Sequence, residues 1–270
     1  MSKPIKYIDK VKRPIIGPCP CAVGHISCGY TVISQILGCP YNCSYCFLHT
    51  FYGRDEIVIY DNEKDILDQV ANYLAKAKQP LRVGTGQYSD SLALPEAVSL
   101  AVKLVNLFAG QKEHTFELKT KSANIDQLLS LDHRDRTVVA WSVNPEQIVR
   151  TEELGTEELK NRISAAKKCV AAGYPVAFHF DPIILYDGWE GDYQAVVDLI
   201  FSTVGPEHIA WISLGALRYK KKRYPETVRI DLFRKMDRFI RAHSKDVKVY
   251  LCMESQAVWQ GSGIPEGSVQ

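Results

Sequence analysis

The sequence predicts an α/β fold built on one parallel sheet. From about residue 31 onward, strand-like and helix-like segments alternate in seven successive units, without a long linker, low-complexity tract or internal repeat. Such alternation is typical of parallel strands joined by right-handed helical crossovers. The nearly continuous apolar run at 174–178 fits a strand that is covered on both faces. An incomplete barrel and a flat doubly wound sheet fit this pattern equally well.

The individual elements follow from local signals. Residues 62–78 carry apolar side chains at helical spacing, and a proline opens the helix expected at 95–109. Gly173 is the expected C-cap of a helix at 157–172. The other expected helices are 124–131, 193–204 and 229–243. The expected strands are 31–37, 81–88, 115–122, 137–144, 175–184, 209–214 and 247–253.

The composition limits the possible function classes. Hydrophobic residues make up 46% and charged residues 24% of the 270 positions, so the chain can bury a sizeable core. A net charge of +2 argues against a protein built mainly to neutralise phosphate. There is no apolar run of membrane-spanning length, and the first 13 residues lack the apolar region of a secretory signal. We therefore expect a cytosolic protein without a membrane partner.

Six of the eight cysteines precede residue 50. Without an export signal, clustered cysteines indicate metal binding or redox chemistry rather than a disulfide framework. Cys169 and Cys252 lie alone in apolar surroundings, and we interpret both as small buried hydrophobic residues.

Cys39, Cys43 and Cys46 form a C-x3-C-x2-C loop. Iron–sulfur clusters require thiolate ligands, and three cysteines leave one iron of a [4Fe–4S] cluster open for another ligand. Gly38 suits a tight loop at the end of a strand, where barrel and open-sheet enzymes place their chemistry. The alternatives are a zinc site with His49 as the fourth ligand, or three unrelated thiols.

An aromatic residue, Tyr45, separates the second and third cysteines, and in this the loop resembles the radical S-adenosylmethionine superfamily. Further segments resemble the spore photoproduct lyase family and follow its order between about residues 19 and 260. These segments are 28–30, 117–122, 141–145, 173–175, 178–182, 211–215 and 250–254.

The resemblance implies a partial (βα)6 TIM-like barrel with the cluster and S-adenosylmethionine at its open end. One electron from a reductant such as flavodoxin or ferredoxin would cleave S-adenosylmethionine to a 5′-deoxyadenosyl radical, which abstracts a hydrogen atom. Tyr45, Lys121, Ser142 and Asn144 match family positions that contact the cofactor. The domains expected from these observations are an N-terminal extension at 1–30, the radical S-adenosylmethionine barrel at 31–260 and a C-terminal tail at 261–270.

The residues themselves add two candidate groups. Lys121 ends a strand, and a buried lysine there needs a counter-charge, which either a cofactor carboxylate or a glutamate would supply. His179 and Asp181 share one face of a strand and are candidate acid/base groups toward a substrate. Alternatively, His179 is a hydrogen-bonded core histidine and Asp181 caps the turn at Pro182.

Two positions depart from the family pattern. The family returns a hydrogen atom to its product from a cysteine, and Gln87 occupies that place in the stretch 87–90. A tyrosine that assists this transfer falls at Phe47, and Tyr88 is a candidate replacement donor. We therefore expect radical chemistry on a substrate that the sequence does not name. The alternatives are a spore photoproduct lyase in DNA repair with a non-cysteine donor, and a non-catalytic metal-binding or nucleic-acid-binding module.

Two more features have open interpretations. The basic run 220–223, flanked by Tyr219 and Tyr224, is either a solvated loop or a nucleic-acid contact. Cys19, Cys21 and Cys28 form C-x-C-x6-C, which is either a set of buried thiols or an auxiliary iron–sulfur site with His25 as a fourth ligand.

Overall fold

Seven parallel strands form the main sheet of the computed structural model, which describes residues 3–9, 13–51, 56–218 and 223–266. The parallel strands lie side by side in their order along the chain. They are β3 (Tyr30–Ile33), β7 (Arg82–Gly84), β8 (Thr115–Thr120), β9 (Thr137–Ser142), β11 (Val176–Ile183), β12 (Ile209–Ala216) and β13 (Val249–Leu251). A doubly wound sheet would reverse its strand order at a switch point. No reversal occurs among the described strands, so the partial barrel is confirmed.

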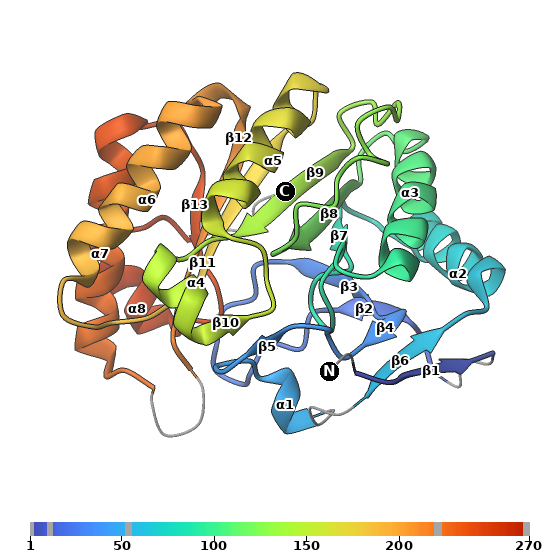
Figure 1. Cartoon of the computed structure of the whole chain (residues 1–270), viewed down its shortest axis with the longest axis horizontal. Helices are drawn as coiled ribbons and strands as arrows, with labels where there is room; N and C mark the ends of the chain where they lie inside the picture. The colour runs from blue at the N-terminus through green and yellow to red at the C-terminus, as the bar shows by residue number, and fades with distance from the viewer. Residues whose placement is uncertain (1–2, 10–12, 52–55, 219–222, 267–270) are drawn as a thin grey trace.

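Helices cover one face of this curled sheet, as Figure 1 shows. The long ones are α2 (Glu63–Lys76), α3 (Pro95–Ala109), α5 (Leu159–Ala171), α6 (Trp189–Val204) and α7 (Glu226–His243). Phe180 of β11 packs against Tyr193 of α6, with 6.2 Å between the ring centroids. Because side chains alternate along a strand, His179 points to the opposite, concave face. Ser142 pairs in register with His179 and therefore shares this face.

The sequence placed several helices accurately. The expected helix 95–109 is α3 to the residue, and Gly173, with φ +89°, follows α5 as expected. The helix expected at 124–131 does not form. Its backbone instead makes isolated turns, such as the bond from Leu128 N–H to Ile125 C=O, and the Ser122 hydroxyl accepts from Asn124 N–H.

Several expected strands are shorter than predicted, and for two of them the structure shows the cause. The strand 31–37 splits, because β3 ends at Ile33 and β4 (Ile36–Leu37) joins a separate sheet with β6 (Ile57–Tyr60) and β1 (Ile5–Ile8). The strand 81–88 ends at Gly84, where a Cβ atom would lie 2.1 Å from the Tyr30 hydroxyl. The close approach at Gly84 therefore needs a residue without a side chain.

The N-terminal segment contributes to both sheets. β2 (Ile16–Pro18) pairs antiparallel with β3 at the edge of the main sheet. Ile26 N–H donates to Glu254 C=O at 2.9 Å, which links this segment to the chain beyond β13. The domain boundaries at residues 30 and 260 stay predictions. The basic residues 220–222 and Tyr219 lie outside the described residues.

The remaining short elements were not predicted from the sequence. They are β5 (Asn42–Cys43), α1 (Leu48–Phe51), α4 (Glu146–Glu152), β10 (Glu153–Leu154), a 3-10 turn at Pro206–His208 and α8 (Gln256–Ser262). In the part of the chain that the structure describes, no helix is long and apolar enough to cross a membrane.

Candidate active site

The cysteine loop leaves the small sheet rather than the barrel strand. It starts directly after β4 at Gly38, whose N–H donates to Tyr88 C=O at 3.0 Å and whose φ is +96°. The ammonium of Lys3 donates to the carbonyl oxygens of Cys39 and Tyr41 at 2.7 and 2.9 Å. The first cysteine is therefore fixed from two sides by segments distant in sequence.

A two-residue strand fixes the second cysteine. Cys43 of β5 pairs antiparallel with Glu153 of β10, and Ser44 N–H donates to Glu152 C=O at 2.8 Å. Cys46 N–H then donates to Cys43 C=O at 3.1 Å, closing the turn that carries the third thiol. Burial raises the pKa of Cys43 to about 12 and also raises the pKa of Cys39. Metal binding here would thus displace protons from the thiols.

The donor set suits a cluster better than a single ion. Within the described ranges, no three His, Cys, Asp or Glu side chains are arranged to hold one metal ion. In a [4Fe–4S] cluster each thiolate binds a different iron, so the sulfurs need not surround one point. Three anchored cysteines fit such a cluster and leave its fourth iron without a protein ligand.

A buried carboxylate, Glu153, gathers the residues beside this loop. The Tyr45 hydroxyl donates to Glu153 Oε1, and Asn144 Nδ2 donates to the same oxygen at 2.9 Å. Arg162 lies 2.6 Å from Glu153 Oε2, and Lys121 Nζ lies 3.9 Å from Oε1. Glu153 was missed by the sequence analysis, although it contacts three of the four residues assigned there to the cofactor.

Glu153 is a single carboxylate that faces two cations, Lys121 and Arg162. Burial would raise the pKa of Glu153, but Lys121 and Arg162 outweigh burial and lower it. Burial likewise opposes the charge on Lys121, but the neighbouring acidic groups, Glu153 foremost, together outweigh burial and raise the pKa of Lys121. Of the two counter-charges considered for Lys121, the structure contains the glutamate. Ser142 stands apart, with its carbonyl accepting from Arg162 at 2.9 Å.

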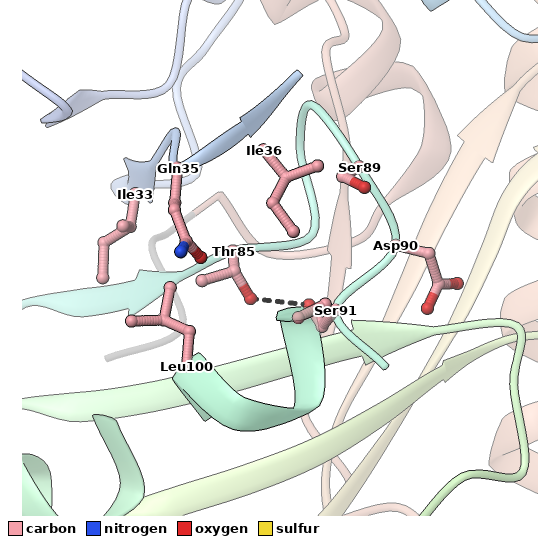
Figure 2. Close-up of a pocket in the computed structure, with 9 residues that line it drawn as sticks. Ile33, Gln35, Ile36, Thr85, Ser89, Asp90, Ser91 and Leu100 are labelled. Carbon is pink, nitrogen blue, oxygen red and sulfur yellow. Dashed lines mark hydrogen bonds between the residues drawn. The ribbon is translucent and has the colours of Figure 1, made fainter. Parts of the chain in front are cut away.

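A second carboxylate, Asp90, holds the loop after β7. Asp90 accepts from Thr120 Oγ1 and Lys121 N–H, each at 2.6 Å, and from Leu92 N–H at 2.9 Å. Asp90 is one of the residues that line a cavity of about 10 Å³. Figure 2 shows these residues and the hydrogen bond that the Thr85 hydroxyl donates to Ser91. This volume suits about one water molecule. The hydrogen bonds that Asp90 accepts therefore fix the backbone at Lys121.

The predicted catalytic residues fall in two places. Tyr88 lies in the Asp90 loop, next to the start of the cysteine loop. His179 lies on the concave face with Nε2 2.6 Å from Glu117 Oε1. Burial would raise the pKa of Glu117, but Arg82 and His179 lower it to about 2, while burial lowers the pKa of His179. The pair is thus a neutral imidazole donating to a carboxylate.

Asp181 has partners of its own. Arg218 donates to Asp181 Oδ1 at 2.8 Å, and the Cys252 thiol donates to the Asp181 carboxylate. The Asp181 side chain is thus held by Arg218 and Cys252, and Cys252 is a hydrogen-bonded polar group rather than a purely hydrophobic one. Cys169, in contrast, is fully buried in the core as expected.

The three remaining N-terminal cysteines give no support to an auxiliary cluster. The Cys19 and Cys21 thiols hydrogen-bond to each other, and Cys28 Sγ accepts from Arg82 at 3.3 Å.

A parallel half-barrel with an anchored C-x3-C-x2-C loop at the carboxyl edge of its strands defines the radical S-adenosylmethionine class. The spore photoproduct lyase family model matches residues 25–233. The chain belongs to the spore photoproduct lyase family.

Known relatives agree with this assignment. Spore photoproduct lyase of Clostridium acetobutylicum is 29% identical over 176 residues, covering 64% of this chain and 52% of the relative. That of Geobacillus sp. is 30% identical over 206 residues, covering 72% and 60%. The chain thus spans between half and two thirds of the length of these relatives.

Solved structures share the fold. A spore photoproduct lyase complexed with dinucleoside spore photoproduct superposes with a TM-score of 0.74 at 22% identity, over 82% of this chain and 76% of that chain. A mutant lyase with bound AdoMet and dinucleoside spore photoproduct gives 0.73 at 20% identity, over 90% and 81%.

Proposed function

We propose that this chain is a radical S-adenosylmethionine enzyme that abstracts a hydrogen atom from a substrate. Cys39, Cys43 and Cys46 would hold the [4Fe–4S] cluster. When bound and reduced, the cluster supplies the electron that cleaves S-adenosylmethionine to methionine and a 5′-deoxyadenosyl radical. The observation that carries the proposal is the anchored three-cysteine loop, strand-paired to Glu153 in a chain of this family.

The cofactor-binding roles rest on the Glu153 cluster. Lys121 Nζ lies 3.9 Å from its carboxylate partner, longer than a hydrogen bond, so its donors can serve a ligand carboxylate. Asn144 and Ser142 would add polar contacts at the end of β9, and Tyr45 would pack against the cofactor. Glu153 would fix Tyr45 and Asn144 in the orientation that binding requires.

The substrate would lie toward the concave face. His179 is neutral and Asp181 is ionised beside Arg218, so both would act as hydrogen-bonding or proton-accepting groups there. Tyr88 carries the phenol that would return a hydrogen atom. A one-electron reductant such as flavodoxin or ferredoxin and a cytosolic location complete the proposal.

A second candidate substrate is the spore photoproduct in DNA. The relatives reported above carry the name spore photoproduct lyase, and two of the solved structures hold dinucleoside spore photoproduct. Gln87 and Phe47 replace two parts of the family's hydrogen return, so this activity would need another donor. The substrate of our first candidate function is therefore left open, and nucleic acids are among the substrates to be tested.

The test is anaerobic reconstitution with iron and sulfide, followed by dithionite and S-adenosylmethionine. We expect about four iron atoms per chain and formation of 5′-deoxyadenosine, with both lost in Cys43→Ala. A fully loaded protein that forms no 5′-deoxyadenosine would refute the proposal. Addition of dinucleoside spore photoproduct then separates the candidates, because restored thymine would favour the second.

A further inference from the structure

Two thiols outside the proposed active site, those of Cys19 and Cys21, lie in a segment that contacts both open ends of the main sheet. They belong to the segment 19–29, which joins β2 to β3. Cys19 N–H donates to Tyr30 C=O at 2.8 Å, and Ile26 N–H donates to Glu254 C=O at 2.9 Å. The segment therefore touches both the first and the last parallel strand regions.

The backbone of this segment brings Cys19 and Cys21 together. Cys21 N–H donates to Cys19 C=O at 2.8 Å, which forms a three-residue turn across Pro20. The Cys19 thiol donates a hydrogen bond to the Cys21 sulfur, and both residues are partly exposed. Two sulfurs in contact across a tight turn can be joined without a large backbone movement.

The surroundings favour a reactive Cys21. The hydrogen bond from Cys19 is the largest influence, and the Ser27 hydroxyl, His25 and Arg218 add to it. Together they outweigh burial and lower the pKa of Cys21 to about 6. The thiolate is the nucleophilic form of cysteine, and neighbouring cations favour it. Buried Cys169 is the opposite case, since burial raises its pKa to about 12.

We propose that Cys19 and Cys21 form a thiol–disulfide exchange site for low-molecular-weight disulfides, with Cys21 as the attacking and Cys19 as the resolving thiol. The Cys21 thiolate attacks one sulfur of the small disulfide, forms a mixed disulfide and releases one thiolate. Cys19 gives up its proton and attacks the Cys21 sulfur, which closes the Cys19–Cys21 disulfide and releases the second small thiol. Two protein thiols are oxidised, and the small disulfide is reduced to two thiols.

Oxidation of this pair would change the electrostatic potential on the concave face through Arg218. The charge of Arg218 acts on Cys21, and Arg218 donates to Asp181 and to the Cys252 carbonyl, each at 2.8 Å. Closing the disulfide removes a negative charge beside this guanidinium. The redox state of the pair is thereby coupled to the electrostatics around Asp181.

The test uses the cluster-loaded full chain, incubated anaerobically with oxidised glutathione, quenched in acid, alkylated and mapped by mass spectrometry. We expect a Cys19–Cys21 disulfide that dithiothreitol reverses. Cys19→Ser should instead accumulate glutathione on Cys21, and Cys21→Ser should lose both products. Cys169→Ser is the matched control and should behave as the unsubstituted chain.

Two results would overturn the proposal. One is full alkylation of both Cys19 and Cys21 after incubation with excess oxidised glutathione. The other is about eight iron atoms per chain, falling to about four in Cys21→Ser, which would assign these thiols to a second cluster. Neither readout uses cofactor cleavage, so this proposal can fail while the proposed function stands.

Discussion

Replacing Glu153 by glutamine removes the charge that organises the candidate cofactor site while keeping the side-chain shape. Glu153 is fully buried and balances Arg162 at 2.6 Å and Lys121 at 3.9 Å. Breaking a buried ion pair by removing one partner costs about 3–5 kcal/mol, because the remaining charge is left uncompensated. Arg162 keeps hydrogen bonds to the Ser142 carbonyl and the Thr156 hydroxyl, at 2.9 and 2.7 Å. We therefore expect the lower end of this range, about 3 kcal/mol.

Urea unfolding of the apoprotein at pH 7 measures this loss directly. The pKa of Glu153 is lowered in the folded state, so its contribution is present above its unfolded pKa and is lost as pH falls through the lower, folded value. The difference between the two proteins should therefore shrink below about pH 4. Equilibrium dialysis with S-adenosylmethionine on the cluster-loaded protein should show weaker binding, since Tyr45 and Asn144 lose a charged acceptor.

Glu152→Gln is the matched control for this substitution. Glu152 is adjacent in sequence and accepts a hydrogen bond from the Ser44 hydroxyl at the surface, whereas the ion pairs to Arg162 and Lys121 belong to Glu153. Its replacement should change the free energy of unfolding by less than about 0.5 kcal/mol. Equal stability and equal cofactor affinity of Glu153→Gln and the unsubstituted chain at pH 7 would refute the reasoning about Glu153.

Three further predictions concern residues around the site. Lys3→Met removes both hydrogen bonds to the cysteine loop, so a chelator should remove iron roughly fivefold faster, equivalent to about 1 kcal/mol. Lys6→Met is the control, and equal rates of iron loss in the two variants would contradict the role of Lys3 in holding the loop. Asp90→Asn places an amide against three donors and should lower the free energy of unfolding by about 1–3 kcal/mol, whereas exposed Asp126→Asn should not. Because burial lowers the pKa of His179, its imidazole NMR signals should stay those of the neutral form at pH 7 and move only at more acidic pH than those of an exposed histidine. Signals of a protonated imidazole at pH 7 would exclude the neutral pairing.

Periodicity predicted the helices well because their buried faces recur at a regular spacing. Residues of α2 such as Ile66, Val70 and Leu74 are buried as the pattern requires. Periodicity failed at 124–131, where side-chain bonds to the backbone replace helical ones. It also could not divide 31–37 between two sheets, because Ile36 and Leu37 are as apolar as β3 and only the pairing with β6 separates them.

The sequence predicted only those site residues that belong to a recognisable motif. The spacing of the three cysteines predicts them as cluster ligands, and the family resemblance predicts Lys121 and Asn144 as cofactor contacts. Glu153 follows Glu152 in an ordinary acidic pair, and only the pairing of β10 with β5 brings one of the two among buried cations. The Cys21 environment depends in the same way on Arg218, nearly two hundred positions away in the chain.

Electron paramagnetic resonance of the reconstituted, dithionite-reduced protein tests the central claim most directly. If Cys39, Cys43 and Cys46 hold a [4Fe–4S] cluster with one open iron, the reduced protein gives the signal of such a cluster. Added S-adenosylmethionine then shifts that signal by binding the open iron. A reduced cluster whose signal is unchanged by saturating S-adenosylmethionine would contradict the account.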